Sequence, residues 1–181
     1  MKSLRRVVTR VCFAASLLIL QGGRIPAIGA AGSSPQPAPG SENSLAIVVN
    51  RSNPVENVTV RELRKIFLGQ RSQWAHGRRI AVVMMEPGRP ERVTMLREVF
   101  HMSEAAYQDY LLKGLFTGDV FLSPKILASP SVVRKFVLNA PGAIGYLRAS
   151  DVDNTIKVLK IDGRVPEDKD YALQVDARLA D

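Results

Sequence analysis

Apolar runs of strand length alternate with helical patterns between residues 45 and 175. Runs such as LAIVVN and IAVVMM are short and continuous, as in strands that are buried on both faces of a sheet. The predicted strands are 45–50, 80–85, 143–147 and 156–161, and the predicted helices are 60–68, 90–100, one that begins at 103 and one over 129–138. This alternation predicts an α/β domain with a mixed, mostly parallel sheet flanked by helices.

Capping residues and helix breakers set the ends of these elements. Thr59 has the position of an N-cap, and Glu62 stands three residues later, which is the spacing of a capping box. Pro90 suits a first helical position, where its missing N–H costs nothing. Glycine and proline make 114–124 an expected irregular segment.

The polar loop 70–79 carries the only tryptophan of the chain, Trp74. We expect this ring to plug the core beneath its loop, because a large apolar side chain is usually buried. The alternative is a cationic stacking platform formed with the neighbouring arginines, which are Arg71, Arg78 and Arg79.

The first 31 residues have the pattern of a secretory signal peptide. A basic start precedes an apolar run over 11–20, which is too short to span a membrane as a helix, and small residues follow. Cleavage is expected near Ala30 or Ala31, so the mature chain is predicted to be periplasmic or secreted, without stable membrane insertion. An uncleaved anchor or a buried N-terminal helix is the alternative. We expect a flexible linker over 32–44, the folded domain over 45–175 and a tail over 176–181.

The charge of the chain depends strongly on this segment. The 181 residues carry a formal charge of +8, which would suggest a nucleic-acid partner. Removing residues 1–31 takes away five of the 25 basic residues and none of the 17 acidic ones, which leaves +3. The single cysteine, Cys12, is removed as well. We therefore expect no nucleic-acid partner and no disulfide in the mature chain.

Sequence patterns of catalysis are missing. The two histidines, His76 and His101, are far apart in the sequence, and no cysteine or histidine spacing suits a metal. No nucleophile elbow and no phosphate-cradling P-loop occurs. The sequence therefore predicts no enzyme activity, no metal and no cofactor.

Several short segments between 45 and 175 match, in order and spacing, those of a known protein family. They are the strand that ends at Asn50, the Asn53-Pro54 turn, IFLG at 66–69, Trp74, the strand 80–85, FTG at 116–118, NAPGAIGYL at 139–147 and IKVLKIDGRVP at 156–166. Together they resemble the phosphate-type periplasmic substrate-binding proteins of ABC transporters, in the type II periplasmic binding protein superfamily. The resemblance implies a solute-binding lobe of that fold and a role in transport.

Two departures from the family pattern limit what the resemblance implies. The family has two lobes that close on a ligand, whereas this chain resembles a short, single-lobe member. The family's phosphate contacts follow the strand that corresponds to 80–85. By position, Met85 replaces an Arg, Pro87 replaces an Asp, and 89–91 replace a Ser-Gly-Thr turn, while Gly88 is kept. The resemblance therefore does not carry phosphate binding over to this chain.

The candidate ligand-binding residues are Gly88, Arg89, Glu91, Arg92, Thr117 and Gly118. A helix that begins at Pro90 would present free N–H groups to an anion, and two arginines would add charged forks, although Glu91 would oppose it. The alternative is an ordinary helix start, in which Arg89 and Arg92 are solvated and bind no ligand. Thr117 could add a hydroxyl to the same anion site, and Gly118 could let the backbone approach the ligand closely. Alternatively, the two residues could form only a tight turn.

Two functional hypotheses follow from the sequence. The first is an exported substrate-binding protein, or its single-lobe relative, that binds a small phosphate-like or carboxylate anion without forming a covalent bond. The second is an interaction module whose exposed face docks on an envelope protein, such as a membrane sensor or transporter, or on a second copy of the chain.

Overall fold

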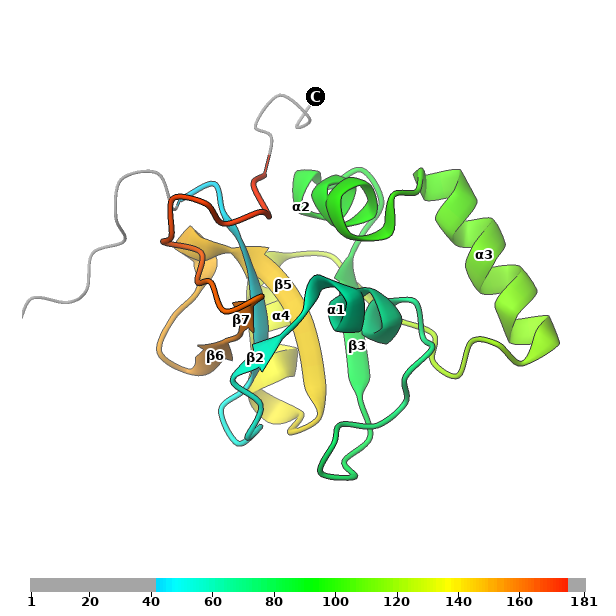
Figure 1. Ribbon diagram of the computed structural model, residues 1–181, viewed down its shortest axis with the longest axis horizontal. Helices are drawn as coiled ribbons and strands as arrows, with labels where there is room; N and C mark the ends of the chain where they lie inside the picture. The colour runs from blue at the N-terminus through cyan, green and yellow to red at the C-terminus, as the bar shows by residue number, and fades with distance from the viewer. Residues whose placement is uncertain (1–41, 176–181) are drawn as a thin grey trace, which may run out of the picture. The chain divides into compact units, whose positions relative to one another are not determined.

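The computed structural model describes residues 42–175 (Figure 1). The predicted signal peptide over 1–31, the part of the linker before residue 42 and the tail over 176–181 lie outside the described residues.

The described chain alternates strands and helices, in the order that the sequence pattern predicts. The elements are β1 (Leu45–Asn50), β2 (Asn57–Val58), α1 (Val60–Phe67), β3 (Ala81–Met85), α2 (Pro90–Thr94), the π-helix η1 (Met95–Phe100), α3 (Glu104–Thr117), β4 (Lys125–Leu127), α4 (Pro130–Asn139), β5 (Ala143–Arg148), the 3₁₀ turn η2 (Ala149–Asp151), β6 (Ile156–Val158) and β7 (Lys160–Ile161).

Five of the described strands form one sheet in the order β4-β3-β5-β1-β6. β3 is parallel to both β4 and β5, whereas β1 is antiparallel to both β5 and β6. Four of these five strands therefore run the same way and β1 alone is reversed. β2 and β7 form a separate parallel pair. The predicted α/β fold with a mixed, mostly parallel sheet is confirmed.

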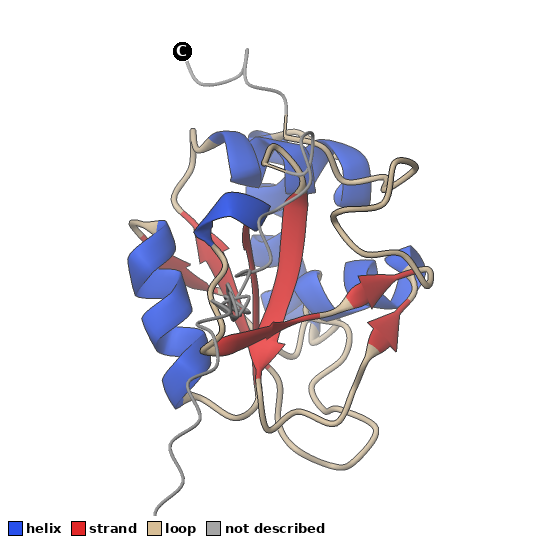
Figure 2. Ribbon diagram, turned by 90° about the vertical axis from the view of Figure 1, so that its left-hand side faces the viewer, coloured by secondary structure: helices blue, strands red, loops and turns tan. Residues whose placement is uncertain are grey.

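Helices cover both faces of the sheet (Figures 1 and 2). Gly145 of β5 faces Val133 and Val137 of α4, and a Cβ at Gly145 would lie 3.2 Å from Val133. The next residue, Tyr146, points the other way and its ring lies 5.9 Å from that of Phe67 in α1. Side chains alternate along a strand, so α4 and α1 lie on opposite faces. All six residues of β1 are buried, as a strand covered on both faces requires.

The helix starts follow the sequence signals. Thr59 caps α1, and its hydroxyl accepts from the Glu62 N–H while the Glu62 carboxylate accepts from the Thr59 N–H, which completes the capping box. Pro90 is the first residue of α2, as predicted. The expected helix over 90–100 changes at Met95 from α to the wider π form.

Two element boundaries differ from the sequence expectation. Gly114 lies inside α3, at the point where Val120 packs against the helix. A Cβ at Gly114 would lie 2.3 Å from Val120 Cγ2, so a larger residue would not fit there. The irregular segment therefore begins at Gly118 rather than at 114. The expected strand 156–161 breaks at Leu159, whose N–H donates to Ile47 O, and β7 then pairs with β2 instead of β1.

Trp74 is buried beneath its loop, and its Nε1–H donates to Gly142 O at 3.0 Å. The expectation of a core plug is confirmed, and no face of the ring is free for stacking.

Candidate functional site

The loop between β3 and α2 lies at the carboxyl edge of the sheet, where β3, β4 and β5 all end. Residues 86–89 are exposed. Gly88 has a φ of +85°, and a side chain there would meet no atom within 4 Å. The position therefore requires glycine for its backbone angle and not for lack of space. This turn brings the start of α2, where the sequence predicts a site, to the carboxyl edge of the sheet.

Arg89 stands at the N-cap position of α2 and is exposed. Its Nη2 donates to Ala128 O at 3.0 Å, which directs the guanidinium toward the start of α4. Among residues 42–175, no carboxylate lies within ion-pair distance of Arg89. A charged fork with unused donors thus faces solvent at this edge.

Two serine hydroxyls lie at the start of α4, next to the carbonyl that Arg89 contacts. Ser129 is the N-cap of α4, and its Oγ lies 3.0 Å from the Oγ of Ser131. A helix of ten residues carries a partial positive charge at this end. The sequence marks these serines only as a helix start. Their place near Arg89 depends on β4, a strand of three residues that the apolar pattern does not predict.

Glu91 is a candidate residue from the sequence, as a charge that opposes an anion. In the structure its carboxylate is buried and accepts from Arg148 Nε at 2.5 Å. The pair cancels both charges. Glu91 therefore opposes an anion much less than the sequence suggests.

The structure corrects the expectation that the Arg92 side chain is open to an anion or to solvent. Arg92 is 3% exposed. Its Nε and Nη2 both donate to the Glu104 carboxylate at 2.7 Å, and its Nη1 donates to Met85 O at 2.8 Å. Burial alone would lower the pKa of Arg92, but the hydrogen bond and charge of Glu104 raise it. This side chain fixes β3, α2 and α3 together.

Two buried tyrosines surround the Arg92 side chain. Its guanidinium carbon lies 5.7 Å from the ring centre of Tyr107, and the Tyr146 hydroxyl accepts from Met85 N–H at 3.0 Å. Burial raises the pKa of both phenols, so they stay neutral at ordinary pH. They act as packing and hydrogen-bonding groups.

Thr117 and Gly118 do not lie at the edge of the sheet where Gly88 and Arg89 lie. They lie at the carboxyl end of α3, whereas Glu104, the partner of Arg92, begins that helix. A helix of this length rises about 20 Å between its ends. Gly118 has a φ of +79°, and the Thr117 hydroxyl donates to Asp119 at 2.6 Å. The structure therefore fits the alternative in which these two residues form only a tight turn.

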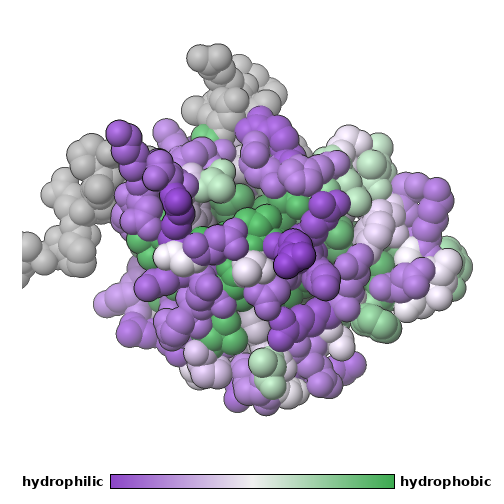
Figure 3. Space-filling view, in the orientation of Figure 1, coloured by the Kyte–Doolittle hydropathy of each residue, from purple (hydrophilic) through white to green (hydrophobic). Residues whose placement is uncertain are grey.

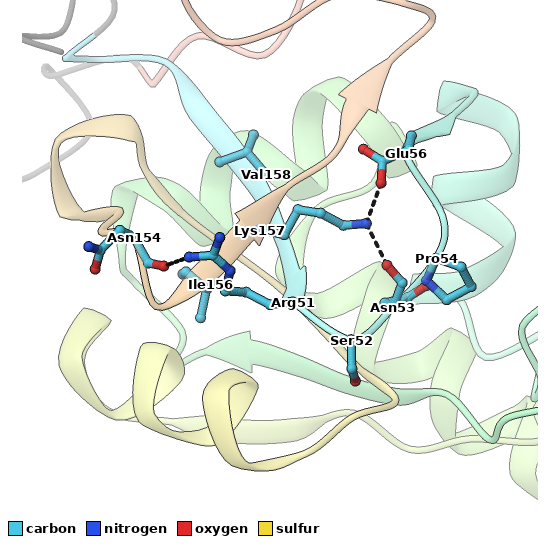
Figure 4. A pocket seen from close by; sticks show the side chains of 9 residues that line it. All are labelled: Arg51, Ser52, Asn53, Pro54, Glu56, Asn154, Ile156, Lys157 and Val158. Carbon is cyan, nitrogen blue, oxygen red and sulfur yellow. Dashed lines mark hydrogen bonds and ion pairs between the residues drawn. The ribbon is translucent and has the colours of Figure 1, made fainter.

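A hollow of about 550 Å³ lies at the amino edge of the sheet, between the turn after β1 and the edge strand β6 (Figure 4). Lys157 crosses it, and its Nζ donates to Glu56 Oε1 at 2.7 Å and to Asn53 O. The Arg51 guanidinium points the opposite way and donates to Asn154 O. The two cationic groups therefore do not converge on one ligand position, and no sequence pattern marks either of them.

Two further classes of site can be checked over the same part of the chain. Between residues 42 and 175, histidine, aspartate and glutamate side chains form no cluster that could hold a metal ion. No helix in this range combines the length and apolar character that a membrane crossing needs.

The chain has relatives among phosphate-binding proteins. It is 29% identical to the phosphate-binding protein PstS of Bacillus subtilis over 130 residues, which is 71% of this chain and 39% of that protein. No model of a protein family matches the chain.

Solved structures of transport receptors share the fold. An ABC-type phosphate transport receptor from Vibrio cholerae superimposes with a TM-score of 0.56 and 25% identity, over 68% of this chain and 48% of that one. PstS from Borrelia burgdorferi shares the fold with a TM-score of 0.58 at 13% identity, over 74% of this chain and 55% of that one.

The chain thus spans only about 39% to 55% of the length of these relatives. Sequence and fold confirm the resemblance to the phosphate-type substrate-binding proteins of ABC transporters, over a part that fits a short, single-lobe member.

Proposed function

We propose that this chain is an exported, single-lobe relative of the phosphate-type substrate-binding proteins that binds a small anion without forming a covalent bond. The observation that carries the proposal is the position of Arg89. Its exposed guanidinium has no carboxylate partner among residues 42–175 and points to the start of α4. A periplasmic or secreted location, after cleavage near Ala30 or Ala31, and a lack of enzyme activity are parts of the same proposal.

Each side chain at this edge has a distinct role in the proposed site. Arg89 supplies the charged fork, and the hydroxyls of Ser129 and Ser131 supply further donors beside the positive end of α4. Gly88 gives the loop its turn. The ion pairs of Glu91 with Arg148 and of Arg92 with Glu104 hold α2 in place. Thr117 and Gly118 have no direct part.

The class of ligand follows from these donors. Phosphate, sulfate and small carboxylates all offer oxygen atoms that match a guanidinium and hydroxyl groups. Residues 86–89 at this edge are exposed to water, so binding is expected to be weak, with a dissociation constant of about 1 mM.

Titration with inorganic phosphate, sulfate and acetate tests the proposal. The exported protein is titrated with each anion, and backbone amide shifts are followed by NMR. We expect saturable shifts at the amides of residues 86, 88, 89, 128, 129, 131 and 132 for at least one anion. Arg89→Gln should weaken that binding about tenfold, because a charged hydrogen-bond donor contributes about 1.5–3 kcal/mol.

Arg61→Gln is the matched control, because Arg61 is an exposed arginine at the start of α1. It should bind the anion as the parent does. Shifts that do not saturate for any of the three anions, or an equal loss in both variants, would contradict an anion site at Arg89.

A second candidate function is an interaction module, and one observation favours it. Four large apolar side chains are exposed on α3 and on the segment that follows it. They are Leu112, Leu115, Phe116 and Phe121. This function does not exclude anion binding, since the two surfaces use different residues.

A further inference from the structure

The outer side of α3 and the segment that follows the helix carry exposed apolar side chains, here called the α3 patch and defined by Leu112, Leu115, Phe116 and Phe121. These side chains are 58%, 51%, 85% and 64% exposed. Figure 3 shows apolar side chains gathered at the edge of the molecule where α3 ends and the following segment turns back. Single exposed apolar residues are common on protein surfaces, whereas a group of four large ones marks an interaction surface.

The core of the domain does not need the α3 patch. α3 turns Tyr107 and Gly114 inward, and these are its buried residues. Ala105, Leu112 and Phe116 follow the spacing of one helical stripe, on the opposite side of α3. Packing within the domain thus leaves this stripe unpartnered.

The charges around the α3 patch favour a protein over a lipid surface as its partner. Asp109 and Lys113 form an exposed pair at 2.7 Å beside the stripe, and Asp119 follows the helix. A helix that lies on a membrane usually has an excess of lysine and arginine on its polar side. Here two acidic residues, Asp109 and Asp119, stand beside one basic residue, Lys113, so nothing draws the patch to anionic lipid.

We propose that a second copy of this chain covers the α3 patch, with the two α3 helices antiparallel about a two-fold axis near Leu112. Under two-fold symmetry, if one residue meets another, the second meets the first in return. With the axis at this point, Phe116 comes opposite Gln108 of the partner copy and within one turn of its small Ala105. Asp109 comes within one turn of Lys113 of the partner copy. Apolar contacts and charges are then both self-complementary.

The size of the surface sets the expected strength of association. α3 has 14 residues and is about 20 Å long. One pair of such helices, with the adjoining Phe121, buries less than the roughly 1,200–2,000 Å² of a stable standard interface. The expected dimer is therefore weak, with a dissociation constant of about 100 µM. The proposal deepens the interaction-module function and is independent of the anion site.

Sedimentation equilibrium of the exported protein, from about 10 to 500 µM, measures the association. We expect a concentration-dependent dimer, and Phe116→Glu should weaken it at least tenfold. Leu138→Glu is the matched control, because Leu138 is also a large apolar residue, 45% exposed, on another helix and away from the Arg89 site. The control should dimerise as the parent does. Both positions are exposed, so neither change should unfold the domain.

A charge swap separates a specific helix pair from general stickiness. Asp109→Lys should weaken the dimer, because it places like charges opposite each other across the axis. The double variant Asp109→Lys/Lys113→Asp should restore the dimer, since each acid again faces a base. General hydrophobic association would not respond to the swap.

A monomer at 500 µM would overturn the proposal, and so would a dimer that Phe116→Glu leaves unchanged or that the double swap fails to restore. Binding of the monomer to lipid vesicles or to a different envelope protein through the α3 patch would overturn it too. The phosphate titration of the Arg89 site is run on the same samples. Failure of the dimer would leave that titration unchanged, so the two proposals can fail separately.

Discussion

Arg92 shows how burial redefines a residue that looks functional in the sequence. Its guanidinium looks available as an anion ligand because its position follows a glycine turn at a helix start. Glu104, its partner, lies 12 positions further on, in a different helix. Nothing in the local sequence pairs them. The pair forms only because the fold places α3 against α2. Arg92 therefore links these two helices and is not available to bind a ligand.

We expect the Glu104 carboxylate to make the stability of the domain pH-dependent. The Arg92 hydrogen bonds lower the pKa of Glu104 below its ordinary value of 4.5. A carboxyl whose folded pKa is lowered stabilises the fold above its unfolded pKa, and this stability is lost as the pH falls through the folded pKa. Urea unfolding midpoints should therefore fall between about pH 5 and pH 3 in the parent, and less steeply in Glu104→Gln.

At pH 7 the same Glu104→Gln change should cost about 1–3 kcal/mol of unfolding free energy, because it leaves the Arg92 charge buried without its counter-charge. Glu98→Gln is the control, since Glu98 forms an exposed pair with Arg97 at 2.6 Å and such pairs contribute little. Equal pH profiles in the parent and Glu104→Gln would show that the carboxylate does not carry this dependence.

At the scale of elements, α3 continues through Gly114, although glycine often ends a helix. Gly114 lies in the interior of α3 and faces Val120 on the returning segment. An Ala in a helix interior normally adds about 1 kcal/mol over Gly. Here Gly114→Ala should instead lower the unfolding free energy by about 1–3 kcal/mol, because its Cβ would overlap Val120 Cγ2.

Thermal unfolding of a double-variant cycle checks this prediction. Val120→Ala removes the methyl groups that Gly114→Ala would meet, so the double variant should be more stable than the sum of the two single effects predicts. A Gly114→Ala variant that is more stable than the parent would refute the overlap.

The sequence predicts the long elements of the fold well and the short ones poorly. Strands β1, β3 and β5 are continuous apolar runs, and α1 has a capping box, so both kinds of element have strong local signals. β2, β4 and β7 have two or three residues and exist only because a neighbouring strand is already in place. The sequence does not predict the part of the candidate site at Ser129, because β4 places that residue. Gly88 and Arg89, in contrast, follow the predicted strand 80–85.

At the scale of the whole domain, the C-terminal segment fastens the first strand. The Tyr171 hydroxyl donates to Leu45 O at 2.9 Å, and Leu45 N–H donates to Leu173 O at 2.8 Å. Tyr171, Leu173 and Val175 are all buried. The segment has almost no regular structure and still belongs to the core.

Truncation measures what this segment contributes. Ending the chain after Asp170 should cost more than about 3 kcal/mol, because three buried apolar side chains are lost, and it should also lower the urea m-value. Ending it after Val175 is the control and should leave the unfolding midpoint unchanged. A chain that ends at Asp170 and unfolds at the same midpoint would refute a role in the core.

The reversed strand of the sheet, β1, also decides when this fold can be completed. β1 comes first in the chain, yet its two partners, β5 and β6, come roughly a hundred residues later, because Leu45 pairs with Arg148 and Val48 with Val158. Closing so long a loop costs entropy before any pairing compensates for it, so folding should be slow for a domain of this size. Until β5 (Ala143–Arg148) has been made, β1 has no partner in the sheet. We therefore expect the chain to stay unfolded through most of its synthesis, which is the state that the proposed export across a membrane requires.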